Sequence, residues 1–388
     1  MKYALRLSLL LGAVAMPAQA QERASTDDGQ TIIVTGQRIE DTRRALEACL
    51  ARKCPPLEDM AATMAHAENL FISGDYRKAR TTVEASVRRN DRFARQHPRE
   101  VATLHRADAR ISIHLGDGET YRSSTYGAVR ALKKGLDDKD LTVLTARFEV
   151  ADMLTRLGRA DEASLVYGDI AKDSARAGQP DLAASAELRQ AWLIYRRLKT
   201  SSALEPIEKI AASTDPALKN SRLGALVLLA RVDRERGRPE GPERLLKALA
   251  DAGVKKPTLL WAPPVDAPYL YDGKQGRGGL SHSAMSLGVA TDRFEKTWAD
   301  VGFWVKADGS VSEAEILRSK GPQTWLEPVL ASISRRIYSP SADSGGTYRV
   351  ERYTWTSLVR TSSGTRLPQH SPQGRIEYVD LTPDLPGQ

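Results

Sequence analysis

The longest run of periodic apolar positions lies between residues 59 and 252. Apolar side chains recur there every three or four residues, which places them on one face of an α-helix. A glycine turn separates one such run from the next, so the pattern predicts a helical hairpin. The apolar positions are Met60, Met64, Ala67 and Phe71 in the first helix and Ala79, Val83 and Val87 in the second.

The turn glycines of this region repeat at a constant spacing. Gly74, Gly116 and Gly158 follow one another at intervals of 42 residues, and Gly237 comes 79 residues later, about two periods. A degenerate turn at Lys199–Ser202 fits the gap. Glycine ends a helix without steric cost, and hairpins that cannot bury an apolar face alone bury it by stacking. The spacing predicts an α-helical solenoid; the alternative is a helical domain without repeats.

Two of these turns resemble the tetratricopeptide repeat family. Gly74–Ala79 (G-D-Y-R-K-A) and Leu157–Ala163 (L-G-R-A-D-E-A) are similar to the middle of that motif. The resemblance covers residues 59–252 and implies stacked helical hairpins that act as a scaffold. The period of about 40 residues exceeds the 34 of the family, and the usual tryptophan is missing. We therefore expect a divergent solenoid and transfer no peptide-binding residues from the family.

The helical pattern stops after residue 252. Proline and glycine dominate residues 253–287, which predicts a linker. Within residues 288–361 the periodicity changes, because Val301, Phe303 and Val305 alternate with polar or exposed positions, as in a half-buried strand. The predicted elements are a strand at Val301–Val305, a hairpin turn at Asp308-Gly309, a strand at Val311–Leu317, a helix from Trp325 and a strand at Tyr348–Trp355.

This order of elements resembles the C-terminal domain of the TonB energy-transducer family. The similar segments are Val301–Val305, Asp308–Val311, Ser319 and the helix end Ile337–Pro340 with the glycines after it. The resemblance implies an α+β fold, in which divergent tetratricopeptide-like hairpins precede a small ββαβ domain. It also implies a sheet edge that binds an extended strand of another protein.

The resemblance places the binding edge at the last strand of that domain. Arg349, Tyr353 and Trp355 are the candidate exposed side chains that tune binding. The implied partners are proteins of the cell envelope, among them a TonB-dependent outer-membrane receptor or its N-terminal strand. Transducers of this family also carry a membrane helix and a long proline-rich spacer. The chain shows neither, which argues against energy transduction.

A short apolar island lies in the N-terminal segment, residues 21–58. Thr31–Gln37 (T-I-I-V-T-G-Q) is similar to a segment near the mature N-terminus of some TonB-dependent receptors. One interpretation is a donated strand that a TonB-like domain captures in the same chain or another. The other is an isolated edge strand or a tail, which we favour because four residues define a pairing register weakly.

Residues 1–20 have the pattern of a signal peptide. Lys2 and Arg6 form a basic start, Leu7–Met16 is apolar, and Ala18-Gln-Ala20 offers a small-residue cleavage site. Ten apolar residues fall short of the roughly 20 that cross a bilayer. We expect cleavage before Gln21 and a periplasmic protein without a membrane span; the alternative is an uncleaved anchor.

The chain contains two cysteines, Cys49 and Cys54. In an exported protein two nearby cysteines predict a disulfide, and free thiols are the weaker alternative. Residues five apart on an unbroken helix cannot bridge, so the helix must end near Cys54, where Pro55-Pro56 provides the stop. The sequence argues against a metal site, because C-x₄-C supplies two ligands and no histidine or acidic cluster completes the set.

Composition adds little to this picture. Of 388 residues 41% are hydrophobic and 27% charged, which excludes a polytopic membrane protein and a wholly disordered one. The net charge of +8 fits solvated helix surfaces better than nucleic-acid binding, because no aromatic residues interleave with the basic ones. The six histidines form no metal motif, and no phosphate loop or nucleophile elbow is present, so we predict no cofactor, no metal and no catalysis.

These observations favour an exported, non-enzymatic protein-interaction scaffold of the cell envelope, with a TonB-like module that docks an extended strand. One alternative is a structural envelope factor that acts through the repeats alone, with the C-terminal module as a cap. A third is a cell-wall hydrolase built around Ser281 and His282. Residues 362–388 are expected to form a polar tail.

Overall fold

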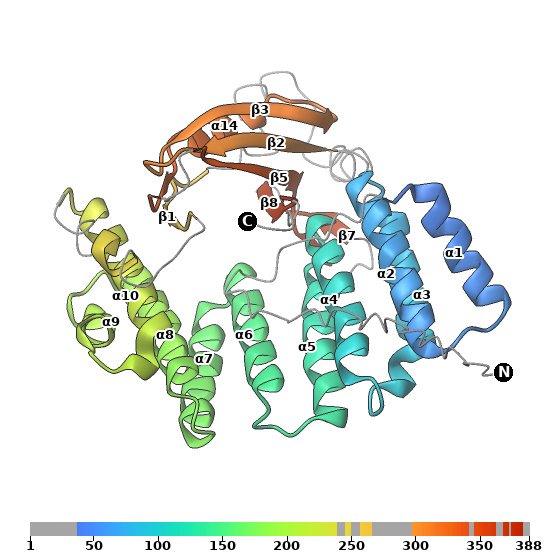
Figure 1. Cartoon of the computed structure of the whole chain (residues 1–388), viewed down its shortest axis with the longest axis horizontal. Coiled ribbons are helices and arrows are strands. Elements are labelled where there is room, and N and C mark those ends of the chain that lie inside the picture. Colours follow the sequence, from blue (N-terminus) through green and yellow to red (C-terminus); the bar gives the residue numbers. More distant parts are fainter. Residues whose placement is uncertain are drawn as a thin grey trace, which may run out of the picture.

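The computed structural model describes residues 37–238, 245–249, 257–265, 297–340, 345–361, 368–371 and 374–382. Within these ranges the chain forms an array of antiparallel helices followed by a small β-sheet region, as Figure 1 shows. The predicted signal peptide, nearly all of the island Thr31–Gln37, most of the linker and the pair Ser281 and His282 lie outside the described residues.

The helical array follows the repeat that the glycines predict. Gly74, Gly116 and Gly158 all have φ between 75° and 80° and join consecutive helices, as does the turn at Lys199, whose φ is 56°. The helices are α1 (Ile39–Ala51), α2 (Pro56–Ile72), α3 (Tyr76–Asn90), α4 (Pro98–His114), α5 (Gly118–Gly135), α6 (Leu141–Arg156), α7 (Ala160–Arg176), α8 (Pro180–Leu198), α9 (Glu205–Ala212) and α10 (Lys219–Glu235).

Local chemistry explains where these helices begin. At two of the turns the residue after the glycine is an aspartate that caps the next helix: Asp75 accepts a hydrogen bond from the amide of Lys78, and Asp117 from that of Thr120. The alanines and valines of each stripe meet in continuous cores between neighbouring hairpins. The array also begins earlier than predicted, since α1 lies before residue 59 and packs through Ile39 on the core of α2 and α3.

The C-terminal region contains the predicted order of strand, strand, helix and strand. The elements are β1 (Leu259–Trp261), β2 (Trp298–Val305), β3 (Val311–Lys320), α14 (Leu326–Ser334), β4 (Ile337–Tyr338), β5 (Thr347–Thr356), β6 (Val359–Thr361), β7 (Pro368–His370) and β8 (Arg375–Asp380). Four antiparallel strands form the main sheet in the order β3-β2-β5-β8. The structure does not identify this sheet as TonB-like.

Two predictions about segments outside the ββαβ unit are wrong. Residues 362–388 do not form only a polar tail, because β8 lies there and pairs with β5 over Glu351–Thr356. The predicted linker contains β1, which pairs with β4. Both strands are short and find their partners far along the chain, so local patterning does not identify them.

The main sheet lies across the ends of several helices of the array (Figure 1). The face of β2 and β5 opposite α14 carries Trp298 and Arg352, and both meet the end of α2 or the turn after it. Arg352 donates hydrogen bonds to the carbonyls of Phe71 and Ile72 at 2.7 Å. A cation suits this place because the C-terminus of a helix carries a partial negative charge.

The same mode of contact recurs at the next two repeats. The amide of Val359 donates to the carbonyl of Gly116 after α4 at 2.8 Å, and Arg375 donates to the carbonyl of Arg156 at the end of α6 at 3.0 Å. The sheet region therefore meets the C-terminal ends of α2, α4 and α6, where the repeated glycine turns begin. Trp298, Val379 and Leu381 of the sheet region join the core of the array.

Candidate functional site

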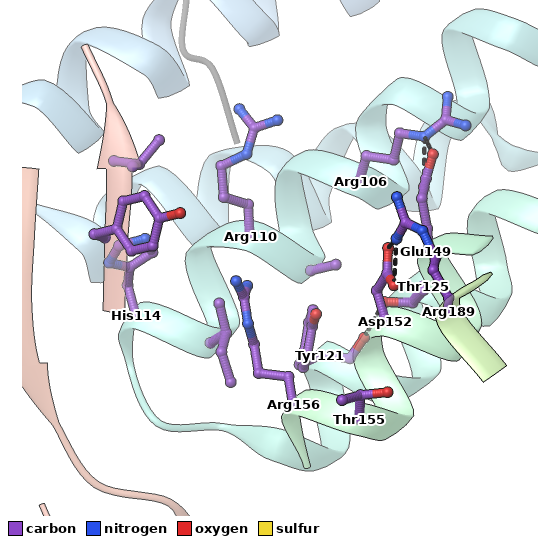
Figure 2. A pocket seen from close by; sticks show the side chains of 14 residues that line it. Arg106, Arg110, His114, Tyr121, Thr125, Glu149, Asp152, Thr155, Arg156 and Arg189 are labelled. Carbon is purple, nitrogen blue, oxygen red and sulfur yellow. Dashed lines mark hydrogen bonds and ion pairs between the residues drawn. The ribbon is translucent and has the colours of Figure 1, made fainter. Parts of the chain in front are cut away.

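A cavity of about 390 Å³ lies between the helical array and β8 (Figure 2). Side chains of α4, α5, α6 and α8 form most of its wall, and Tyr378 and Val379 of β8 complete it. Its size falls within the range of ordinary ligand pockets. The cavity is lined by Arg106, Ala109, Arg110, Ile113, His114, Tyr121, Thr125, Glu149, Asp152, Thr155, Arg156, Arg189, Tyr378 and Val379.

Charged residues, three of them at equivalent repeat positions, form a row that enters this wall at Arg110, Asp152 and Arg189. Glu68 of α2, Arg110 of α4 and Asp152 of α6 are 42 residues apart, so each occupies the same place in its hairpin. The charges of these three side chains alternate in sign, and Arg189 of α8 adds a positive charge after Asp152. Arg189 donates hydrogen bonds to both carboxylate oxygens of Asp152 at 2.7 Å. We call Glu68, Arg110, Asp152 and Arg189 the charged row.

A second ion pair lies beside the charged row. Arg106 of α4 donates to both carboxylate oxygens of Glu149 of α6 at 2.8 and 2.9 Å, and the two side chains are about one-third exposed. Figure 2 shows this pair and the pair between Asp152 and Arg189 on the same side of the cavity. Each of the two carboxylates in the wall is therefore held by an arginine.

Two further arginines of the wall, Arg110 of α4 and Arg156 of α6, lie apart from these two ion pairs (Figure 2). The guanidinium of Arg156 lies 3.8 Å from a carboxylate oxygen of Glu377 of β8, and the other oxygen of Glu377 accepts a hydrogen bond from Arg375 at 2.9 Å. Burial lowers the pKa of Arg110, and nearby Arg106 lowers it further, although Glu68 and Glu149 oppose this. Burial also raises the pKa of the Tyr121 phenol to about 12, so this group is neutral at ordinary pH.

His114 joins the cavity to the interface with the sheet. Its Nδ1 lies 2.9 Å from the hydroxyl of Thr354 of β5, and the same hydroxyl lies 2.9 Å from that of Tyr76. Burial lowers the pKa of His114 well below its usual value, and Arg156, Arg352 and Arg110 lower it further. The imidazole is therefore neutral and acts as a hydrogen-bonding part of the interface.

Glu68 makes the stability of the chain depend on pH. Burial raises its carboxyl pKa from 4.5 to about 7, with Arg110 opposing. Because the pKa of the folded state exceeds that of the unfolded chain, stability falls as the pH rises from 4.5 through 7. We expect Glu68→Gln to be more stable than the parent by about 1–2 kcal/mol at pH 8. At about pH 4 the two should be equal, because the carboxyl is then largely protonated in both states.

Urea unfolding of the parent and the Glu68→Gln variant at the two pH values measures this difference. Glu84→Gln provides a control, because Glu84 is partly exposed and already paired with Arg80. A parent that is the more stable of the two at pH 8 would contradict the proposed cost of ionising Glu68.

The structure corrects the predicted binding edge. The outer side of β5 pairs with β8, so it is not available to an added strand. Tyr353 is 2% exposed, and its hydroxyl accepts from Arg336 at 2.7 Å. Trp355 stacks on Trp325, and Arg349 donates to the carbonyl of Pro257 and pairs with Asp380. The three residues support the interior of the sheet region instead of forming an exposed binding edge.

The predicted disulfide is present. Cys49 and Cys54 are bonded, with Cα atoms 5.1 Å apart. Helix α1 ends at Ala51, and Lys53 has φ of 53°, so the chain turns back before Pro55 as the prediction required. Glu58 lies close to both sulfurs, and within the described residues this is the single cluster with metal-ligand geometry; its cysteines are oxidised.

In the described part of the chain, no helix combines the length and the apolar composition needed to cross a membrane. No protein-family model matches the chain, and neither does any curated protein.

Solved structures that are similar to it include repeat proteins. The kinesin light chain TPR-like repeats from Podosopora anserina are 18% identical, with 56% of this chain and 97% of that one covered and a TM-score of 0.36. BtubC from P. vanneervenii is 17% identical, with 62% and 99% covered and a TM-score of 0.42. The apo form of RapI is 12% identical, with 55% and 77% covered and a TM-score of 0.33. Because all three scores are low, we base the function on the chain's own geometry.

Proposed function

We propose that this protein is a non-enzymatic scaffold that binds a segment of a partner protein in the cavity between the helical array and β8. The cavity itself carries this proposal, because it is open, of ligand size and walled by both parts of the fold. Its mixture of arginines, tyrosines and small apolar side chains is the composition that favours protein recognition.

The side chains of the cavity give less support to catalysis. Both carboxylate oxygens of Glu149 and of Asp152 accept hydrogen bonds from an arginine, so each carboxylate is engaged in an ion pair within the wall. His114 is committed to the interface with Thr354. The hydrolase hypothesis rests on Ser281 and His282, which lie outside the described residues, and it is the weaker candidate.

We further propose that the chain is exported and meets its partner in the cell envelope. The three-part pattern of residues 1–20 and the disulfide between Cys49 and Cys54 support this, since disulfides persist in oxidising compartments. Mass measurement of protein recovered from an envelope fraction tests it. A chain that begins at Gln21 is expected, and one that retains residues 1–20 would contradict cleavage.

The hypothesis that a partner strand docks beside β5 requires a different binding site. Strand addition at β5 would require β8 to leave the sheet, together with Tyr378 and Val379 of the cavity wall. We therefore place the partner in the cavity and not at that edge. The alternative of a scaffold that uses the repeats alone is disfavoured, because removal of residues 288–361 would take away β2, β3 and β5, on which β8 depends.

Photo-crosslinking of the full-length chain tests the proposed site. Benzoylphenylalanine is placed at position 378 in the cavity wall, or at position 126 on α5, outside the residues that line it. The tyrosines at these positions are similarly exposed, at 40% and 36%. We expect a discrete crosslinked partner from position 378 and none of the same mass from position 126. Equal crosslinking from both positions, or none from 378, would contradict the proposal.

A further inference from the structure

We propose that the chain, once its disulfide is reduced, binds a zinc ion at the turn between α1 and α2. The protein ligands are the sulfurs of Cys49 and Cys54 and a carboxylate oxygen of Glu58. This inference goes beyond the proposed function and does not depend on it. It assigns two alternative cross-links to one turn, a disulfide in the oxidised chain and a metal ion in the reduced chain.

The three ligand atoms already lie close together. The two sulfurs and one oxygen of Glu58 are all within 4.8 Å of one another. Around a tetrahedral zinc ion, with bonds of about 2.3 Å to sulfur and 2.1 Å to oxygen, ligand atoms lie roughly 3.6–3.8 Å apart. Cleavage of the disulfide lets the sulfurs separate to that distance, and Glu58 needs to approach by about 1 Å. Rotation of three side chains is therefore enough to form the site.

The backbone of the turn keeps the ligands adjacent without the sulfur–sulfur bond. The Cα atoms of Cys49 and Cys54 are 5.1 Å apart, and the amide of Cys54 donates to the carbonyl of Cys49 at 3.0 Å. A spacing of four residues between two cysteines lies within the range of zinc-ligand pairs. Glu58 supplies the third ligand from the first turn of α2. The fold thus completes a ligand set of which the cysteine spacing alone shows two members.

The chemistry of this ligand set suits zinc. Thiolates favour zinc over magnesium and calcium, and a carboxylate is an ordinary third ligand for it. Two thiolates and one carboxylate leave the zinc site with one negative charge, and Arg52 lies beside it. Arg52 donates to Oε2 of Glu58 at 2.5 Å, so Oε1 can bind the ion while that hydrogen bond is kept. Water takes the fourth position.

A dithiol reductant opens the site by thiol–disulfide exchange. Cys54 is partly exposed, whereas Cys49 is 3% exposed. A thiolate of the reductant attacks the sulfur of Cys54, and Cys49 leaves as the thiolate. The second thiol of the reductant then displaces Cys54, so two electrons pass to the protein and the reductant becomes a disulfide. Zinc binding releases the two protons of the protein thiols to solvent.

The cross-link matters for α1 because this helix buries few side chains. They are Thr42, Leu46 and Cys49. A helix with so little buried surface opens readily unless another contact holds it. In the reduced, zinc-free chain we therefore expect faster hydrogen exchange in α1 than in the oxidised chain, and zinc should restore the protection.

A zinc titration tests the site. The full-length chain is reduced with dithiothreitol, separated from it without oxygen, and titrated with zinc chloride in competition with a chromophoric chelator. We expect one tightly bound zinc ion per reduced chain and none per oxidised chain. Equal binding by the oxidised chain would overturn the inference, because the thiolates would not be the ligands. Absence of binding by the reduced chain would also overturn it.

Variants identify the ligands. Glu58→Gln should weaken zinc binding at least about tenfold, since even groups outside a ligand set are worth that much. Glu47→Gln is the matched control, because Glu47 is also exposed and paired with an arginine, and it should stay within about twofold of the parent. A Cys49→Ser/Cys54→Ser variant that binds as tightly as the reduced parent would place the ion elsewhere and overturn the inference. An equal loss in Glu47→Gln would do the same.

Hydrogen exchange of α1 gives a second readout in the same samples. Zinc is expected to restore protection in the reduced parent and to do so poorly in the reduced Glu58→Gln variant. Zinc that binds without any change in the exchange of α1 would contradict a cross-link of this turn. Circular dichroism of each variant confirms that a loss of zinc binding is not a loss of fold.

Discussion

Replacing Arg352 with methionine is expected to lower the free energy of unfolding by about 3–5 kcal/mol, the largest effect we predict. Arg352 is 0% exposed and Asp300, which it contacts at 2.5 Å, is 2% exposed. The guanidinium also satisfies the last carbonyls of α2 and lies over the ring of Trp298 at 3.9 Å. Its removal leaves a buried carboxylate without its main partner. Urea unfolding measures the loss.

Arg318 provides a matched control, because it pairs with the same Asp300 but is 49% exposed. Arg318→Met should cost less than about 1 kcal/mol, as is usual for exposed ion pairs. Adding Asp300→Asn to Arg352→Met should recover part of the stability, since the orphaned charge is then gone. A cost for Arg318→Met equal to that for Arg352→Met would contradict the burial argument.

The second large effect is expected at a repeat turn. In Gly116→Ala the new Cβ would lie 1.9 Å from the carbonyl oxygen of Ser357, a distance that real contacts do not reach. The residue also has φ of 75°, which alanine adopts at a cost. We expect a loss of about 3 kcal/mol or more, because backbone of the sheet region must move away from α4.

Gly158→Ala separates steric conflict from backbone strain. Gly158 occupies the equivalent turn with φ of 78°, and no atom lies within 4 Å of the place that an added methyl group would take. The expected loss there is about 1 kcal/mol from backbone conformation alone. Thermal unfolding of both variants gives the comparison. If the two variants lose the same amount, the close approach of Ser357 to the turn is not a constraint.

The helical array could be predicted because its signals are local. Apolar spacing identifies each helix, and a turn that needs φ above zero favours glycine, so the glycines mark the repeat at Gly74, Gly116 and Gly158. The same holds for the strands of the ββαβ unit, where alternation and the turn at Gly309 suffice. Helix α14 begins at Leu326, beside the predicted start at Trp325.

The burial of the proposed binding edge could not be predicted, because the elements that cover β5 are distant from it in the sequence. Arg349, Tyr353 and Trp355 have the same parity along β5, so their side chains share the face that α14 covers. Arg352 and Thr354 have the other parity and face the array. Alternation alone does not distinguish a half-buried strand from one that is covered on both faces by different parts of the fold.

The cavity escaped prediction for a related reason, although one signal was available. Glu68, Arg110 and Asp152 recur at the 42-residue spacing of the glycines, which places charges at one repeat position where apolar side chains would otherwise stack. Tyr378 and Val379 complete the cavity from a strand that sequence patterning assigned to a tail. The repeat spacing could therefore have indicated the charged row, whereas no sequence pattern indicated that β8 forms the opposite wall of the cavity.

The central claim is that the sheet region and the helical array form one cooperative unit and build the cavity together. Hydrogen exchange of the full-length chain across a urea series, followed by mass spectrometry on peptides from α4 and from β5, tests it most directly. We predict that both peptides lose protection at the same urea concentration. Loss of protection in β5 well before α4 would show two independent units and would contradict the account.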